Sequence, residues 1–109
     1  MGIFWIESQP NKVSWERQAL EELGMTVSVA RTTQDALNYL RHGTFDLILS
    51  DVHRRGDRDA GTDVLPYLKK IAPDIPIIFY VTQLDEGEET PEGSTGITDQ
   101  PDELLHLVL

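Results

Sequence analysis

Short apolar runs alternate along the chain with longer segments of helical periodicity. The apolar runs have the length of strands, and the segments between them are long enough to form helices. We expect strands at residues 2–6, 26–30, 45–50, 75–81 and 96–98. We expect helices at residues 11–23, 33–43, 63–72 and from residue 101 onward.

Two of the predicted helices carry residues that mark their ends. Thr32 can cap the second helix, with Asp35 in a capping-box-like position, and Gly43 can end it. Pro66 interrupts the third helix unless it lies in the first turn. If Asp63 is the N-cap, Pro66 is the third helical residue, where its missing N–H breaks no helical bond.

The alternation of strands and helices predicts an α/β fold. This order implies right-handed crossovers and a parallel sheet with helices on both faces, which makes a three-layer domain. The unbroken apolar run at 75–81 agrees, because a strand covered on both faces need not alternate. A chain of 109 residues suits one such domain, which we assign to residues 1–109.

The chain is acidic, and its charge is unevenly distributed. The formal net charge is −10, and residues 71–109 contain nine acids and no lysine or arginine. This argues against direct binding to nucleic acid; the acidic region is either a solubility feature or a surface for basic proteins. With no cysteine, no apolar stretch of about 20 residues and no signal-peptide pattern, we expect a cytoplasmic protein without membrane contact.

Carboxylates follow two of the predicted strands. Asp51 ends the apolar run at 45–50, and Glu7 follows the first strand. The carboxyl ends of parallel strands meet at the edge of the sheet where α/β folds have their functional crevice. An isolated aspartate there is usually a turn or cap residue, but two converging carboxylates are costly unless a cation or a proton joins them.

Five segments in this order resemble the receiver domains of two-component response regulators. The segments are IFWIESQP, ARTTQDALNYL, FDLILSDV, GTDVLPYLKKIAPDIPIIFYV and GSTGITDQPDELL. The resemblance covers nearly the whole chain. It implies a flavodoxin-like domain with a five-stranded parallel sheet of strand order 2-1-3-4-5, and a phosphoacceptor aspartate, which is Asp51 in this sequence.

The resemblance implies a metal site around the acceptor. In the family, Mg²⁺ is bound by the acceptor, by an acidic pair after the first strand and by the backbone carbonyl two residues beyond the acceptor. These positions are Asp51, Glu7 with Ser8, and His53. Because Ser8 replaces the second acid, a charge and a hard oxygen ligand are lost, and we expect Mg²⁺ binding to be weak or absent.

The resemblance also implies phosphoryl-binding residues after the fourth and fifth strands. The family has a hydroxyl at the first position, which falls on Val81 here, with Thr82 one residue later. It has a lysine at the second position, which is Gln100 here. Losing that lysine forfeits a charge-assisted hydrogen bond of about 1.5–3 kcal/mol, so we predict severely slowed phosphotransfer.

Three further features depart from the family pattern. The loop after the acceptor carries Arg54, Arg55 and Arg58: either a guanidinium replaces Mg²⁺ permanently at the carboxylates, or these are solvated loop charges. The segment 82–96 is too short and too rich in Gly and Glu for the family's fourth helix, which we expect to be shortened or missing. The apolar, uncapped end of the chain leads us to expect a domain excised from a larger protein.

We therefore predict a receiver-like domain with a degenerate phosphoacceptor site, which regulates by binding and is not an enzyme. We expect its partner to be another protein or another domain of the same chain, independent of phosphorylation, and a homodimer stays open. The alternative is an active receiver in which Glu7, Asp51 and the carbonyl of His53 hold Mg²⁺ and Asp51 is phosphorylated. A third hypothesis, an enzyme that uses Glu7 and Asp51, rests on the fold alone.

Overall fold

The computed structural model describes residues 2–7, 9–43, 45–51, 60–81 and 94–108. Its five strands are β1 (Gly2–Ile6), β2 (Thr26–Ala30), β3 (Leu47–Ser50), β4 (Ile77–Tyr80) and β5 (Gly96–Thr98). Its helices are α1 (Ser14–Glu22), preceded by the 3₁₀ turn η1 (Pro10–Val13), α2 (Thr33–His42), α3 (Ala60–Ile71) and α4 (Pro101–Val108).

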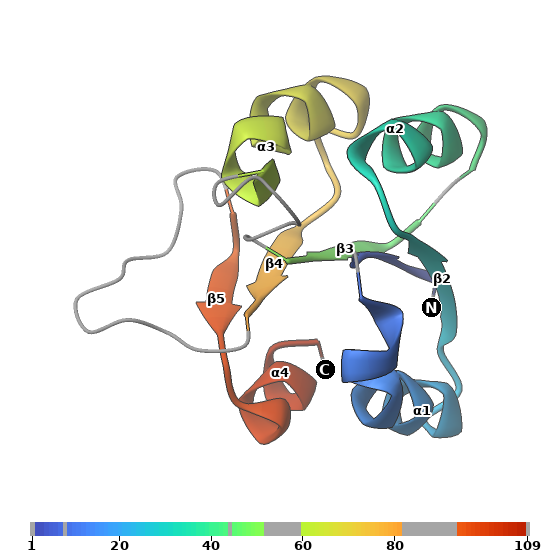
Figure 1. Cartoon of the computed structure of the whole chain (residues 1–109), viewed down its shortest axis with the longest axis vertical. Coiled ribbons are helices and arrows are strands. Elements are labelled where there is room, and N and C mark those ends of the chain that lie inside the picture. The colour runs from blue at the N-terminus through green and yellow to red at the C-terminus, as the bar shows by residue number, and fades with distance from the viewer. Residues whose placement is uncertain (1, 8, 44, 52–59, 82–93, 109) are drawn as a thin grey trace.

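The strands form one parallel sheet in the order β2-β1-β3-β4-β5. Helices α2 and α3 cover one face of the sheet, and α1 and α4 cover the other (Figure 1). The predicted three-layer α/β domain with strand order 2-1-3-4-5 is therefore confirmed. Strand order reverses between β1 and β3, so the carboxyl ends of these two strands flank the place where such folds bind ligands.

Each face of the sheet has its own apolar core, because side chains alternate between the two faces along every strand. Phe4, Ile48 and Phe79 belong to the core under α2 and α3. Trp5 and Leu49 belong to the core under α1 and α4. Burying each of these large side chains stabilises the fold by about 1.5–3 kcal/mol, so the two cores fix the register of the sheet.

Most predicted elements are confirmed, with shifted ends. The backbone N–H of Asp35 donates to the hydroxyl of Thr32 at 3.1 Å, which confirms the predicted cap of α2. Gly43 ends that helix in an extended conformation. The predicted helix at 11–23 begins as the turn η1, and the predicted strands at 45–50 and 75–81 are shortened to β3 and β4.

The prediction that Asp63 caps α3 is wrong. The helix begins at Ala60, so Pro66 lies in its interior, where it cannot donate the bond to the carbonyl four residues earlier. The helix continues past the proline because the flanking Leu65 and Leu68 are buried against the sheet. Their burial offsets the missing bond.

Two further predictions concern the family's fourth helix and the absence of membrane contact. The expected loss of the family's fourth helix concerns residues 82–93, which lie outside the described residues. Of the helices within the described ranges, none has the length and apolar character needed to cross a membrane.

Candidate functional site

The first two candidate residues, Glu7 and Asp51, are neighbours at the carboxyl edge of the sheet. Ile6 pairs with Ser50 in the register of β1 and β3. The backbone N–H of Asp51 donates to the carbonyl of Ile6 at 3.0 Å, so the ladder continues one residue past β3. Adjacent strands lie about 4.8 Å apart, and the two carboxylates therefore extend from neighbouring positions.

Continuing this register across the sheet adds Tyr80 and Thr98 to the same row. Ser50 pairs with Phe79, so Asp51 is level with Tyr80, and Tyr80 pairs with Thr98. All four side chains of this polar row (Glu7, Asp51, Tyr80 and Thr98) are buried.

The row below on the same face is apolar and includes Trp5, Leu49 and Ile78. On this face the side chains thus change from apolar to polar between these two rows. The apolar core ends there, and the candidate site begins.

The carboxylate of Glu7 shapes the turn that follows β1. Its side chain is 8% exposed, and Oε1 accepts a hydrogen bond from the backbone N–H of Gln9 at 3.0 Å. Lys12 then donates its backbone N–H to the carbonyl of Gln9 at 3.0 Å, and Pro10 begins the 3₁₀ turn with its fixed φ. Glu7 therefore holds in place the turn that presents the side chain of Lys12.

The acceptor candidate Asp51 is 5% exposed. The hydroxyl of Ser50, which is fully buried, donates to the backbone carbonyl of Asp51 at 2.8 Å. Together with the bond from Asp51 N–H to Ile6, this fixes the peptide groups on both sides of the aspartate. The local sequence thus holds the aspartate rigidly at the strand end, as a positioned nucleophile or ligand requires.

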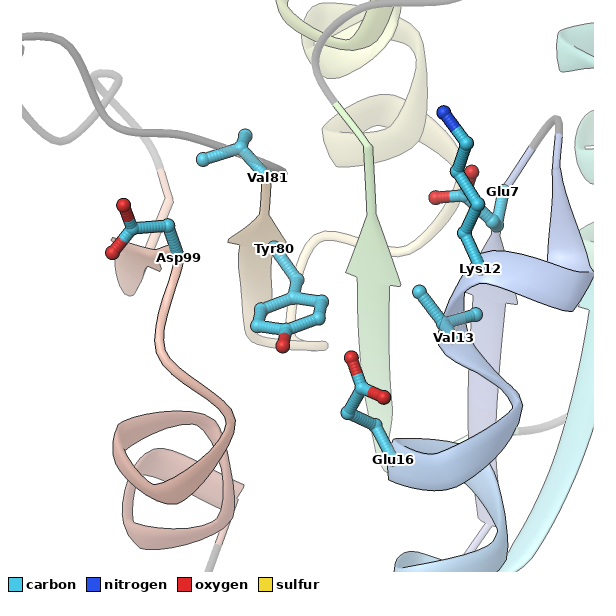
Figure 2. Close-up of a pocket in the computed structure, with 7 residues that line it drawn as sticks. All are labelled: Glu7, Lys12, Val13, Glu16, Tyr80, Val81 and Asp99. Carbon is cyan, nitrogen blue, oxygen red and sulfur yellow. The ribbon is translucent and has the colours of Figure 1, made fainter.

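A cavity of about 350 Å³ opens beside Glu7 between the first helix and the last two strands (Figure 2). It is lined by Glu7, Lys12, Val13, Glu16, Tyr80, Val81 and Asp99. Three of these residues are acids and one is a lysine. The site therefore has carboxylate oxygens on both sides, from the β1–α1 segment and from the end of β5.

Tyr80 and Glu16 form a hydrogen bond across this cavity. In Figure 2 the hydroxyl of Tyr80 lies toward the carboxylate of Glu16. Burial raises the pKa of the Tyr80 phenol well above its ordinary value, and the hydrogen bond and charge of Glu16 raise that pKa further, with smaller effects of Asp99 and Asp102. The phenol therefore stays neutral and acts as a donor to the carboxylate.

At the far end of the site, Asp99 is the neighbour of Val81. The backbone N–H of Val81 donates to the carbonyl of Thr98 at 3.0 Å, which continues the β4–β5 ladder past both strands. Val81 is buried, and Asp99 lines the cavity beside it. A carboxylate thus lies next to the residue at the family's hydroxyl position.

Gln100, the predicted phosphoryl-binding residue, is exposed, and its hydrogen bonds are to residues close to it in the sequence. Its amide Nε2 donates to Asp99 Oδ1 at 3.1 Å, and its backbone N–H donates to the hydroxyl of Thr98 at 3.1 Å. Its carbonyl accepts from Leu104 N at 2.9 Å in the first turn of α4. These contacts give Gln100 a role in starting α4.

The remaining candidates cannot be placed. Ser8, His53, Arg54, Arg55, Arg58 and Thr82 lie outside the described residues. Within the described part of the chain, no group of three or more histidines, aspartates or glutamates is arranged to hold a metal ion. The carboxylates of Glu7 and Asp51 nevertheless offer the hard oxygens that Mg²⁺ prefers, so these two residues fit a metal ligand set that others would have to complete.

Sequence reasoning missed four polar residues of the cavity, namely Lys12, Glu16, Tyr80 and Asp99. Lys12 and Glu16 are four residues apart, a spacing that puts both on one side of a helical segment. Asp99 would have followed from the β4–β5 register. Tyr80 lies in an unbroken apolar run that predicts a strand covered on both faces, so the sequence carried no signal for its polar partner on α1.

The chain is similar to known regulatory proteins. A family model described as the response regulator receiver domain matches residues 3–97. The luminescence regulatory protein LuxO of Vibrio campbellii is 39% identical over 74 residues, which make up 68% of this chain and 16% of that protein. The regulatory protein LuxO of Vibrio vulnificus strain YJ016 is 38% identical over the same shares. The match spans only a small part of the length of these relatives.

Solved structures share the fold. The response regulator protein TrrA of Thermotoga maritima, in complex with Mg²⁺ and BeF, has a TM-score of 0.82 at 22% identity, covering 98% of this chain and 95% of that one. The chemotaxis response regulator CheY4 of Vibrio cholerae has a TM-score of 0.79 at 20% identity, with coverages of 98% and 94%. At such identities the likeness is one of fold.

Proposed function

This chain belongs to the response regulator receiver domain family of two-component signalling, and from that premise we propose that it is a degenerate receiver. In this proposal Asp51 is a structural carboxylate, and the domain regulates by binding a protein or another domain of its own chain. Phosphorylation is not required for that binding. We further propose that it acts in the cytoplasm.

The observation that carries this proposal is the position of Asp99 beside Val81. Receivers use a hydroxyl and a lysine at this end of the site to bind phosphoryl oxygens. Here an apolar side chain is buried at the first position, and the residue beside it, just past β5, is Asp99, whose carboxylate lines the cavity. Like charges repel strongly in a partly buried site, so a phosphoryl group on Asp51 would meet repulsion where it needs a cation.

The charge of the whole cavity supports the same proposal. Three acids line it, and Lys12 is the cation that faces them among the described lining residues. A phosphoryl group carries about −1.5 to −2 charges at neutral pH. Phosphoryl transfer depends mainly on positioning and on neutralising this charge, which favours a site that no longer performs the reaction.

The adjacency of Glu7 and Asp51 favours a second candidate function. Two buried carboxylates on neighbouring strands are the core of a divalent ion site, and Mg²⁺ would supply the positive charge that polarises a phosphoryl donor there. In that case Glu7 and Asp51 hold the ion together with the carbonyl of His53, Thr82 contacts the phosphoryl group, and Asp51 is the acceptor. This alternative is an active receiver.

A Mg²⁺ and beryllofluoride titration separates the two candidates. Trp5 is fully buried one row below the site, so its fluorescence can report binding. The degenerate receiver predicts no saturable response, with the fold intact by circular dichroism. A saturable response at millimolar Mg²⁺ that is lost in Asp51→Asn would establish the active receiver. Asp74→Asn is the matched control, because Asp74 is exposed and precedes β4 at the opposite edge of the sheet.

A further inference from the structure

The surface helix α1 presents apolar side chains to solvent (Figure 1). Trp15, Ala19 and Leu23 follow one another at intervals of four residues, so they lie along one side of the helix and form what we call the α1 stripe. Trp15 is 61% exposed, Leu23 is 54% exposed, and Ala19 is half-buried. Large apolar side chains grouped on a surface are typical of protein interfaces, in which tryptophan is enriched.

The core of the domain does not use Trp15. The buried residues of the segment that forms η1 and α1 are Val13, Glu16 and Leu20. The exposed polar side chains of α1 bond to each other within the helix: Arg17 pairs with Glu21 at 3.0 Å, and the amide of Gln18 donates to Glu22 at 3.3 Å. What these polar pairs leave facing water is the α1 stripe.

The end of α1 does not need the side chain of Leu23 either. Gly24, with a φ of 92°, ends the helix: its N–H donates to the carbonyl of Glu21 at 3.0 Å, and the N–H of Met25 donates to the carbonyl of Leu20 at 3.2 Å. In this type of helix end the residue after the glycine makes the apolar contact, and Met25 indeed packs against the core. The helix end therefore holds Leu23 in place while its side chain remains exposed.

We propose that two copies of this chain associate through the α1 stripe, with their α1 helices antiparallel about a two-fold axis at Ala19. A two-fold interface uses the same surface on both subunits, so that surface must be complementary to itself. Trp15 and Leu23 are each four residues from Ala19, so Trp15 of one copy is level with Leu23 of the other. The small side chain of Ala19 lies between these two contacts and allows the helices to approach closely.

The polar side chains beside the stripe fit the same arrangement. Gln18 precedes Ala19 by one residue and Glu22 follows it by three, so Gln18 of one copy is within two residues of the level of Glu22 of the other. The amide that donates to Glu22 in its own helix can therefore donate to Glu22 of the second copy. One pair of short helices buries an area at or below the low end of specific interfaces, about 1,200 Å², so the dimer is weak and reversible.

This inference goes beyond the proposed function and does not depend on the state of Asp51, because the residues of the α1 stripe are not among those that line the cavity. Sedimentation velocity tests it. Between about 10 µM and 1 mM the wild-type chain should shift reversibly from monomer to dimer. Trp15→Ala should weaken dimerisation at least about 30-fold, because a tryptophan buried in an interface is typically a hot spot.

Tyr67→Ala is the matched control, because Tyr67 is an equally exposed aromatic residue on α3, on the other face of the sheet. It should dimerise as the wild type does, and circular dichroism checks that both variants are folded. A wild-type chain that stays monomeric up to about 1 mM would overturn the inference. So would a folded Trp15→Ala variant that dimerises no more weakly than Tyr67→Ala.

The position of the two-fold axis is tested with cysteine, because the chain has none. A disulfide needs two Cα atoms within about 4.4–6.8 Å of each other, which equivalent residues of two copies reach only near the axis. Under mild oxidation Ala19→Cys should form a covalent dimer much faster than Asn38→Cys, at an exposed position on α2. Equal rates would overturn the inference. The proposed function is decided separately, by the Mg²⁺ and beryllofluoride titration, so the two can fail independently.

Discussion

Tyr80 on β4 donates its phenolic proton to the carboxylate of Glu16 on α1, and both side chains are more than nine-tenths buried. The bond joins the first helix to the fourth strand, two elements that are far apart in the sequence. It also closes one wall of the cavity beside Glu7. A neutral donor thus satisfies a buried carboxylate at the base of the candidate site.

Removing this donor should destabilise the protein. In Tyr80→Phe the carboxylate of Glu16 stays buried without its phenol, and a hydrogen bond to a charged group contributes about 1.5–3 kcal/mol. We expect the free energy of unfolding, measured with urea at neutral pH, to fall by this amount. Tyr67→Phe is the matched control, because Tyr67 is 62% exposed. Equal effects of the two substitutions would show that the bond contributes nothing.

The same tyrosine should make stability depend on pH in alkali. Burial and then Glu16 raise the pKa of Tyr80 in the folded protein. An unfolded tyrosine loses its proton near pH 10, so above about pH 10 the unfolded state binds fewer protons than the folded state. Stability is therefore unaffected below that pH and falls above it, by up to about 1.4 kcal/mol per pH unit.

Urea unfolding between about pH 8 and pH 11 checks this pH dependence, with Tyr80→Phe as the reference. The difference in stability between wild type and variant should be constant below about pH 10 and should shrink above it. The difference between their absorbance titrations isolates the ionisation of Tyr80. A tyrosinate signal from Tyr80 near its ordinary pKa would contradict the prediction.

The sequence predicted the layers of the fold because they follow from local patterns. The apolar runs and the cap at Thr32 are decided within a few residues, and β1, β2, β5 and α2 have the predicted positions. The start of α3 was wrong because Pro66 appeared to require a first-turn position. Packing of Leu65 and Leu68 decided that helix instead, and such packing is a tertiary effect.

The sequence predicted only those residues of the candidate site that directly follow a strand. Glu7 and Asp51 follow apolar runs directly, so their adjacency follows from a parallel sheet. Counting back from Pro101 selected Gln100 for the end of β5, whereas the β4–β5 register sets Asp99 beside Val81. The bounds of β5 were predicted, but its alignment with β4 is a contact between two strands, for which a segment of three residues carries no signal.

The effect of adding a cation at the carboxyl end of β5 should depend on which residue is replaced by lysine. Asp99→Lys replaces a carboxylate that lines the cavity, whereas Gln100→Lys changes an exposed residue at the start of α4. One charge-assisted hydrogen bond of about 1.5–3 kcal/mol corresponds to roughly a 10- to 100-fold gain in affinity. We expect a gain of this order in beryllofluoride binding, measured with Mg²⁺ by Trp5 fluorescence, for Asp99→Lys and little change for Gln100→Lys.

Asp99→Asn separates the loss of repulsion from the gain of a cation. It should give a smaller increase in beryllofluoride affinity than Asp99→Lys, because it removes the negative charge without adding a donor cation. If Gln100→Lys gained more affinity than Asp99→Lys, the position counted from Pro101 would be the correct one. The register argument for Asp99 would then be wrong.

The arginines of the loop after Asp51 remain a separate prediction, since Arg54 and Arg55 lie outside the described residues. If either guanidinium pairs with Asp51, the double variant Arg54→Gln/Arg55→Gln should lose stability in the wild-type background and much less in Asp51→Asn. Double-mutant cycles of contacting charges give coupling energies of about 0.5–3 kcal/mol. Arg41→Gln, at an exposed site on α2, should show no coupling to Asp51.

The cycle also separates the loop arginines from Lys12 as the source of positive charge. Urea unfolding of the same cycle with Lys12→Met measures the coupling of the lysine to Asp51 under identical conditions. Coupling confined to Lys12 would leave Arg54 and Arg55 as solvated charges, because a guanidinium held on Asp51 could not be lost without effect. Coupling confined to the arginines would assign the offsetting charge to the loop.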